Sequence, residues 1–439
     1  MISNDKKISD YLKFIFPLCL FSLFQHIYSL IDIVNGSLLG TDEMSYIVYI
    51  DQVMLIILAF ANSSAIAISV LISKRIEQGK IKEIKSVIVN SFIILFIVAL
   101  VILLFISFFD SLFLKLIFAP EKFYQMDKIY LQIRAVDNFF LFFNLAILAI
   151  EKAKGNTKKV FYINSLGIAI KIIASFLIQK LVTMSLMILA IVTITPSIFV
   201  FLCSLYLFFN SKNLYKIQVK DLKVKGEVIK EFSDFALPLF LSMCVFNIGK
   251  TFANFQALQY GVKAVGYLGI SNRLIGLMTA VANGLQEAIS ILLARYREID
   301  KKITKFVVKI SFYSNLVVTS VGVFLYLLTF KELTLYFANQ DPYIAKQITE
   351  ILLLELIGAI FLPFTNFMIG VLYGFERTKT VFIISFMRIF IFRNLILFIF
   401  SFTNLDSIAL GLAMLVSHLG TFIFTFFIVR KEFKNQVII

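Results

Sequence analysis

Gln25-His26-Ile27-Tyr28-Ser29-Leu30-Ile31-Asp32-Ile33-Val34-Asn35-Gly36-Ser37-Leu38-Leu39-Gly40 closes the first apolar run of the chain, which begins near Tyr11. The run is long enough to cross a bilayer. Asp32 is the only acid between Asp10 and Asp42, and it sits well inside the run. A carboxylate at that depth costs about 2.5–3.5 kcal/mol on insertion scales. Asp32 therefore requires a partner, a proton or a water-filled cavity, which makes it a candidate functional residue.

The composition excludes an ordinary soluble protein. Of the 439 residues, 60% are hydrophobic and 16% are charged, whereas a soluble domain is about 45–50% apolar and 25% charged. The sequence therefore predicts an all-α polytopic membrane protein. The net charge of +15 lies in short loops, which indicates membrane topology rather than a nucleic-acid partner. The three cysteines are scattered in apolar segments and predict neither a disulfide framework nor a metal site.

Twelve apolar segments are long enough to span a membrane, since about 20 apolar residues cross the hydrocarbon core. We expect spans at approximately 12–39, 46–73, 87–109, 126–150, 160–180, 184–209, 234–260, 264–294, 306–330, 343–373, 380–402 and 406–429. Spans four and ten are the least apolar, because Arg134, Asp137 and Glu355 lie within them.

The loops between the predicted spans alternate in charge. Lys and Arg gather near the N-terminus, after every second span and at the C-terminus, whereas the other loops are poor in basic residues. Basic loops stay on the cytoplasmic side of a membrane. The pattern therefore predicts an even number of spans with both termini in the cytoplasm.

The two halves of the chain repeat at an offset of 221 residues. Without a gap, this offset pairs Phe14 with Phe235, Pro17 with Pro238, Gly40 with Gly261, Tyr46 with Tyr267, Ala61-Asn62 with Ala282-Asn283, Ile68-Ser69 with Ile289-Ser290 and Thr157-Lys158 with Thr378-Lys379. We expect an N-lobe over 1–209, a basic cytoplasmic linker over 210–232 and a C-lobe over 233–439, with six spans in each lobe. Both repeats enter the membrane in the same direction. We therefore expect a pseudo-two-fold axis along the membrane normal and a substrate path between the lobes.

Short motifs follow one another along almost the whole chain. They are Gln25-x-x-Tyr28-x-x-x-Asp32, Gly155-Asn156-Thr157-Lys158, Tyr260-Gly261 with Gly269 and Arg273, Gly284-Leu285-Gln286, Gly370-x-x-x-Gly374-x-x-Arg377-Thr378-Lys379 and Arg388-x-x-x-x-Arg393. Their order and spacing resemble the multidrug and toxin extrusion (MATE) family, of the multidrug/oligosaccharidyl-lipid/polysaccharide exporter superfamily. The twelve spans and the internal repeat agree with this resemblance.

The resemblance implies two six-helix lobes that face each other in a V. It also implies a secondary-active efflux transporter that exports amphipathic small molecules by alternating access across the bacterial cytoplasmic membrane. We expect a monomer in the lipid bilayer, driven by an ion gradient and without a resident cofactor. The sequence shows no phosphate-binding loop, metal-binding helix or nucleophile elbow, so we expect no enzymatic activity.

The fifth span departs from the resemblance at two positions. Where the family usually has Asn and, four residues later, Asp, this sequence has Lys171 and Ser175, although Thr193 in span six still fits. A sodium site needs several hard oxygen ligands, so the lost carboxylate argues against one. We expect proton rather than sodium coupling, with Asp32 alternately protonated and free. Lys171, Ser175 and Thr193 complete the expected coupling site.

Two interpretations of Lys171 stay open. An ion pair with Asp32, broken when the acid is protonated, would join two charges that are each costly alone. Alternatively, Lys171 snorkels or faces a wet cavity without touching Asp32. Asp32 itself is either the coupling residue or a structural acid that is permanently paired with a base.

Further polar residues within the spans are candidates for a substrate cavity. We expect it to include Gln25, Tyr28, Asn247, Lys250, Gln256 and Gln286. Other buried ionisable residues are Glu287, Glu355, Arg388, Arg393 and His418. For the two arginines we expect pairing with Glu355 or with carbonyls, and for His418 either packing or a response to pH. The basic interior favours anionic, zwitterionic or peptide-like substrates.

A second class of function also fits the chain. A flippase or exporter of a lipid-linked glycan or a peptide product, from the same superfamily, is supported by the basic interior. The twelve-span layout with MATE-like turns counts against it. A non-transporting receptor or channel subunit would need a soluble sensor domain, and we see none within these residues.

Overall fold

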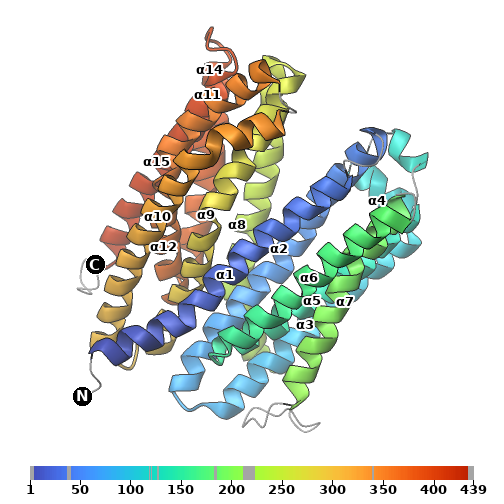
Figure 1. Ribbon diagram of the computed structural model, residues 1–439. Coiled ribbons are helices and arrows are strands. Elements are labelled where there is room, and N and C mark those ends of the chain that lie inside the picture. Colours follow the sequence, from blue (N-terminus) through green and yellow to red (C-terminus); the bar gives the residue numbers. More distant parts are fainter. Residues whose placement is uncertain are drawn as a thin grey trace. The chain divides into compact units, whose positions relative to one another are not determined.

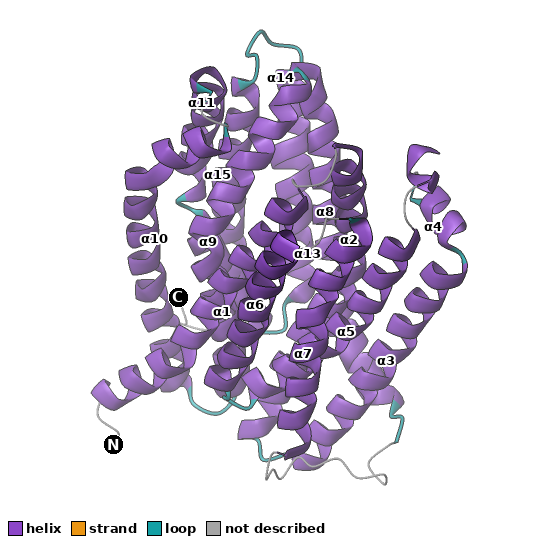
Figure 2. Cartoon of the chain, turned by 45° about the vertical axis from the view of Figure 1, so that its right-hand side comes forward, coloured by secondary structure: helices purple, strands orange, loops and turns teal. Residues whose placement is uncertain are grey.

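The computed structural model describes residues 4–36, 41–117, 119, 121–125, 128–181, 185–210, 223–338 and 341–433. At some helix positions in these ranges, including 28–36, the side chains lie outside the described part. All regular elements in these ranges are helices, and no strand occurs among them (Figure 2). In chain order they are α1 (Asn4–Gly36), α2 (Thr41–Glu77), α3 (Ile81–Phe108), α4 (Asp110–Leu116), η1 (Glu121–Gln125), α5 (Lys128–Ala153), α6 (Thr157–Leu181), α7 (Leu186–Asn210), α8 (Gly226–Ala257), η3 (Leu258–Tyr260), α9 (Val262–Tyr296), α10 (Lys301–Phe337), α11 (Pro342–Ala359), α12 (Leu362–Gly374), α13 (Thr378–Phe386), η4 (Met387–Leu395), α14 (Ile396–Phe400) and α15 (Ile408–Phe433).

The helices form two compact units. Unit 1 comprises Met1–Pro17 and Phe24–Phe240, and unit 2 comprises Leu18–Leu23 and Leu241–Ile439. In unit 1, α5 packs against α2, α3 and α7, while α6 packs against α7. In unit 2, α9 packs against α10, α11 and α12, while α15 packs against α11, α12 and η4 (Figure 1). Helix α8 already begins at Gly226, inside the segment predicted as a linker.

The helices agree with the predicted membrane spans. Within the described residues, 11 helices are long and apolar enough to cross a membrane, and the bent pair α11 and α12 makes a twelfth if it counts as one span. The all-α, twelve-span prediction is thereby confirmed. The sequence did not predict α4 and η1, which lie between the third and fourth spans.

Two of the spans in unit 2 are irregular. Helices α11 and α12 meet at a bend of 43°. Pro363 lies in the first turn of α12, where its ring would clash with the carbonyl of Ala359, the last residue of α11, if the helix continued. The next span passes from α13 through the π-helical segment η4 into α14. Both irregular spans carry ionisable residues.

The buried charges of the fourth span are paired within unit 1. Arg134 of α5 donates from one nitrogen to Asp137 and from another to Asp51 of α2, each over 2.8 Å. The Asp137 residue is 1% exposed. Buried charges are tolerated when they are paired and hydrogen-bonded. The network explains how this span accommodates an arginine and an acid.

The internal repeat is visible in two turns. The α5–α6 turn has hydrogen bonds from the N–H of Gly155 to the carbonyl of Lys152, and from Asn156 to Glu151. The α12–α13 turn has the equivalent bonds, from Glu376 to Tyr373 and from Arg377 to Leu372. Gly155 has φ +92°, and Glu376 has φ +60°. The same helix-ending turn is therefore built twice, 221 residues apart.

Candidate functional site

The helices of unit 2 hold a cluster of ionisable side chains within their membrane spans. Lys250 comes from α8, Glu355 from α11, Arg388 and Arg393 from η4, and His418 from α15. Glu355, Arg393 and His418 are 1%, 3% and 2% exposed, whereas Lys250 and Arg388 are partly exposed. Lys250, Arg388 and Arg393 each lie near enough to Glu355 for their charges to interact with its carboxylate. Three cations thus lie near one carboxylate.

Both oxygens of the Glu355 carboxylate have protein partners. The hydroxyl of Ser271, on α9, donates a hydrogen bond to Oε2. His418 Nε2 lies 3.5 Å from Oε1. Tyr326 of α10 also lies within reach of the carboxylate's charge. Ser271 of α9 and His418 of α15 therefore contact the Glu355 carboxylate, with Tyr326 nearby, and the sequence predicted neither Ser271 nor Tyr326 as part of this environment.

The π-helical segment brings the two arginines to one side of η4. Residues five apart lie on nearly the same face of a π-helix, because its hydrogen bonds run over i to i+5, whereas in an α-helix they lie about 140° apart. The amide of Asn394 donates to the carbonyl of Ile389 over 2.7 Å and to that of Gly249, on α8, over 3.0 Å. Asn394 thus ties the irregular segment to the turn of α8 that carries Lys250.

Gly249 allows the close approach of α8 and η4. A Cβ built on Gly249 would lie 2.2 Å from Cγ1 of Ile389, so any larger residue would force the Ile389 side chain or η4 itself to move. Small residues permit such close approach between membrane helices. Gly249 therefore helps to place Lys250 beside η4.

The Phe246 ring lies close to two of the cations. Its ring centroid is 4.9 Å from Lys250 Nζ and 5.0 Å from Arg388 Cζ. Both distances lie within the range of a cation–π contact, about 6 Å. The ring is partly exposed. One aromatic side chain therefore contacts two positively charged groups that belong to different helices.

The predicted coupling residues of the N-lobe fall in α1, α6 and α7. Lys171 is fully buried at 0% exposure, and Ser175 and Thr193 are 6% and 7% exposed. The Thr193 hydroxyl donates to the carbonyl of Leu189 in its own helix over 2.9 Å. Asp32 and Tyr28 lie outside the residues whose side chains the structure describes, and Gln25 of α1 is exposed.

The other residues predicted for the C-lobe cavity do not join the cluster through any described contact. Asn247 is half-buried, and its carbonyl accepts a hydrogen bond from Thr251 over 3.2 Å. Gln256 has a buried Oε1 without a partner among the described atoms. The backbone of Gln286, on α9, packs against Gly370 of α12. Of the four residues predicted in unit 2, Lys250 is thus the one in the cluster.

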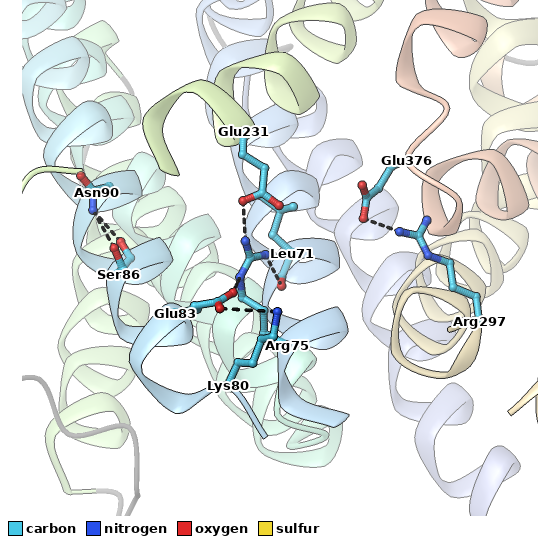
Figure 3. A network of polar contacts seen from close by, with 9 residues as sticks. All are labelled: Leu71, Arg75, Lys80, Glu83, Ser86, Asn90, Glu231, Arg297 and Glu376. Atoms are coloured by element: carbon cyan, nitrogen blue, oxygen red, sulfur yellow. Dashed lines mark hydrogen bonds and ion pairs between the residues drawn. The ribbon is translucent and has the colours of Figure 1, made fainter. Parts of the chain in front are cut away.

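Further ion pairs join helix ends in each unit. In unit 1, Arg75 of α2 lies between Glu231 of α8 and Glu83 of α3, with Nε 3.2 Å from the Glu83 carboxylate (Figure 3). In unit 2, Arg297 donates to Glu376 over 2.6 Å and to the carbonyl of Gly374 over 2.8 Å. These contacts link helix ends, in contrast to the cluster around Glu355, which lies within the spans.

Comparison with known proteins gives the family of the chain. The MatE family model matches residues 17–177 and 238–400, whereas a search of curated proteins finds no match. Among solved structures, a MATE in complex with MaL6 has a TM-score of 0.89 at 18% identity, covering 97% of this chain and 96% of that one. A MOP superfamily transporter from Pyrococcus furiosus, described as having a binding pocket of reversed polarity, has a TM-score of 0.84 at 18% identity, covering 97% and 95%.

An outward-facing multidrug resistance MATE family transporter of the MOP superfamily likewise has a TM-score of 0.84, at 19% identity, covering 97% of this chain and 95% of that one. At these identities the structural likeness shows the fold, and the family model shows the membership. The spans of the chain require a lipid bilayer around it. The chain belongs to the MatE family and is a multi-pass membrane transporter.

Proposed function

We propose that the protein is a secondary-active exporter that couples the inward movement of protons to the export of amphipathic small molecules by alternating access. The observation that carries this proposal is the buried Glu355 carboxylate, which contacts His418 inside the helices of unit 2. A buried acid beside a histidine can change its charge by taking up a proton, and that change can favour one state of a two-state transporter.

In the N-lobe, Asp32 is the proposed coupling residue, and Lys171 is its proposed partner. Lys171 is 0% exposed, and an ammonium group removed from water needs a compensating charge or must lose its proton. Protonation of Asp32 would break this ion pair, and the loss of the pair would change how the helices of the N-lobe pack. Ser175 and Thr193, also buried, would provide polar neighbours in the same lobe.

The choice of protons over sodium rests on ligand chemistry. Sodium prefers several hard oxygen ligands, and span five offers Lys171 and Ser175 where relatives usually have an amide and a carboxylate. A charged lysine repels a cation. We therefore propose proton coupling, without a metal site and without a resident cofactor.

Transport into inside-out vesicles tests this function. A proton gradient is imposed, and the uptake of one cationic and one anionic amphipathic dye is measured for wild type, Asp32→Asn and Glu355→Gln. We expect gradient-dependent uptake of at least one dye by wild type, and a large loss with both Asp32→Asn and Glu355→Gln. If neither dye responds to the gradient, with wild type equal to Asp32→Asn, the exporter proposal is wrong.

A flippase or exporter of a lipid-linked glycan or a peptide product is the second candidate. It is favoured by the three cations around Glu355 and by the likeness to a transporter with a pocket of reversed polarity. Gradient-independent translocation of a lipid phosphate in proteoliposomes, together with inert dyes, would favour this alternative.

The membrane context completes the proposal. We propose a monomer in the bacterial cytoplasmic membrane with both termini in the cytoplasm, because the basic loops recur after every second span. Reporter fusions at each terminus test the orientation. Light scattering of the detergent-solubilised protein tests the monomer, and a mass of two chains per particle would contradict it.

A further inference from the structure

We infer that unit 2 binds the anionic group of an amphipathic ligand, a carboxylate or a phosphate, between Lys250 of α8 and Arg388 of η4, with Phe246 beside the apolar part of the ligand. The inference rests on the proposed export function and deepens it by naming the charge of the substrate. It also assigns the residues that would recognise that charge.

The first support is an excess of positive charge within the spans of unit 2. The cluster contains Lys250, Arg388 and Arg393, while Glu355 is the carboxylate near enough to interact with all three. Its oxygens are already occupied by Ser271 and by the contact with His418. Two of the three cations therefore have no local countercharge among the described residues of unit 2.

The second support is the lack of partners for the cations. Among the described residues, the side chains of Lys250, Arg388 and Arg393 form no ion pair and no hydrogen bond; the buried Nε atoms of both arginines are unsatisfied. Arg393 is 3% exposed. An unpaired guanidinium group removed from water is costly, and an anion that supplied hydrogen-bond acceptors would remove that cost.

The third support is the arrangement around Phe246. Lys250 Nζ and Arg388 Cζ lie 4.9 and 5.0 Å from the centroid of its ring. Two cations on one ring repel each other, and the ring quadrupole offsets only part of that repulsion. A single anion placed between them would be attracted to both. Lys250, Arg388 and Phe246 are each partly exposed, as the proposal requires of residues that contact a ligand.

The fourth support is the irregular backbone that presents the arginines. The π-helical turn of η4 brings Arg388 and Arg393 to one side, and Asn394 fixes this turn to α8 at Gly249. Such π-helical turns occur frequently at functional sites. Arg393, which is buried, adds a third positive charge near Lys250 and Arg388. The guanidinium fork of Arg388 matches the two oxygens of a carboxylate or phosphate.

The absence of tryptophan from the chain allows a direct binding test. Phe246→Trp introduces one indole at the site and retains an aromatic ring there. The purified variant, in a neutral detergent, is titrated with dodecyl phosphate, with dodecanoate and with the cation dodecyltrimethylammonium. We expect the indole fluorescence to respond to at least one anion at a concentration ten times lower than to the cation. The stronger anion then identifies a phosphate or a carboxylate as the recognised group.

Charge variants on the same background locate the binding site. We expect Lys250→Gln and Arg388→Gln each to raise the apparent Kd of the preferred anion at least tenfold, and Arg388→Lys to raise it less than Arg388→Gln. Lys346→Gln, which changes an exposed lysine of α11 with a side chain that is 72% exposed, is the matched control and should leave the Kd unchanged. Retained melting temperatures show that each variant is folded. If Arg388→Gln does not fold, Lys250→Gln and Arg388→Lys decide the outcome.

The binding test is independent of the transport test, because no ion gradient is present. Equal responses to the anions and the cation, or unchanged Kd values in folded Lys250→Gln and Arg388→Gln, would overturn the anion site. Loss of gradient-driven uptake with intact anion binding would instead overturn proton-coupled export and leave the site in place.

Discussion

Arg297 at the end of α9 donates a hydrogen bond to the carboxylate of Glu376 over 2.6 Å, although Glu376 holds its backbone at φ +60°. The Arg297 side chain is 9% exposed, and that of Glu376 is 27% exposed. A non-glycine residue in the left-handed region costs about 1–2 kcal/mol. At this position the ion pair therefore stabilises the folded protein, whereas the strained backbone destabilises it.

Comparing two substitutions at position 376 separates these effects. Glu376→Ala removes the ion pair but keeps a Cβ, so the backbone strain remains. Glu376→Gly removes both the ion pair and the Cβ, and so relieves the strain. We expect the alanine variant to be less stable than the glycine variant by about 1 kcal/mol. Thermal unfolding in detergent measures the difference, and equal melting temperatures would show that the turn stores no strain.

Arg75 should matter more to stability than the acid it contacts on α3. Its side chain is 9% exposed and contacts Glu83, Glu231 and the carbonyl of Leu71, whereas the Glu83 side chain is 47% exposed. We expect Arg75→Gln to cost about 1.5–3 kcal/mol, because it removes several charge-assisted hydrogen bonds. Glu83→Gln should cost less than about 1 kcal/mol. Chemical unfolding of the two variants checks the order, and a larger loss for Glu83→Gln would contradict it.

Gly249→Ala should disturb the contact between α8 and η4. The added methyl group would lie 2.2 Å from Ile389, and overpacking of this kind typically costs about 1–3 kcal/mol. Gly266→Ala is the control, because a Cβ there meets nothing within 4 Å, and alanine in a helix interior should be neutral or stabilising. Thermal unfolding compares the two, and Ile389→Ala should partly rescue Gly249→Ala. No difference between the glycine variants would show that the close approach is dispensable.

A double-mutant cycle tests the proposed pair of Asp32 and Lys171. We expect Asp32→Asn and Lys171→Leu each to destabilise the protein by about 3–5 kcal/mol, because each would remove the proposed partner of the remaining charge. The double variant should be much better tolerated than the sum of the two losses. The free energy of unfolding of all four proteins gives the coupling. If the losses of the two single variants simply add in the double variant, Lys171 contacts another partner or faces a water-filled cavity instead of Asp32.

The spans could be predicted from the sequence because the bilayer imposes a length on every apolar run. The 221-residue repeat was equally visible, and the turns at Gly155 and Glu376 show it in the backbone. The break between α11 and α12 was not predicted, although Pro363 marks it, because a proline can also kink a continuous span. The start of α8 at Gly226 was missed because its first turns are polar.

The members of the site were visible in the sequence, but their partners were not. Lys250, Glu355, Arg388, Arg393 and His418 all stand out as ionisable residues in apolar spans. We expected the arginines to pair with Glu355 or with carbonyls, yet no such pair occurs among the described residues, since Ser271 and His418 contact that carboxylate. Which side chains meet across two helices depends on how each helix is rotated about its own axis, and the sequence does not specify that rotation.

The segment η4 shows most clearly how the direction of a side chain depends on the local turn of the helix. The spacing Arg388-x-x-x-x-Arg393 places the two side chains on different faces of an α-helix and on nearly one face of a π-helix. No local signal in Met387–Leu395 specifies the wider turn. The bond from Asn394 to Gly249 spans 145 residues, so the local form of η4 is fixed by tertiary contact.

The repeated turn also bears on the origin of the chain. Six candidate spans separate the turn at Gly155 from the turn at Glu376, if α11 and α12 count as one, so an even number of crossings lies between the two copies. Tandem duplication and fusion of a six-span gene produces this arrangement without any reversal of the membrane orientation of its product. In this chain the two copies differ at the turn: one has glycine, and the other has an acid that Arg297 contacts.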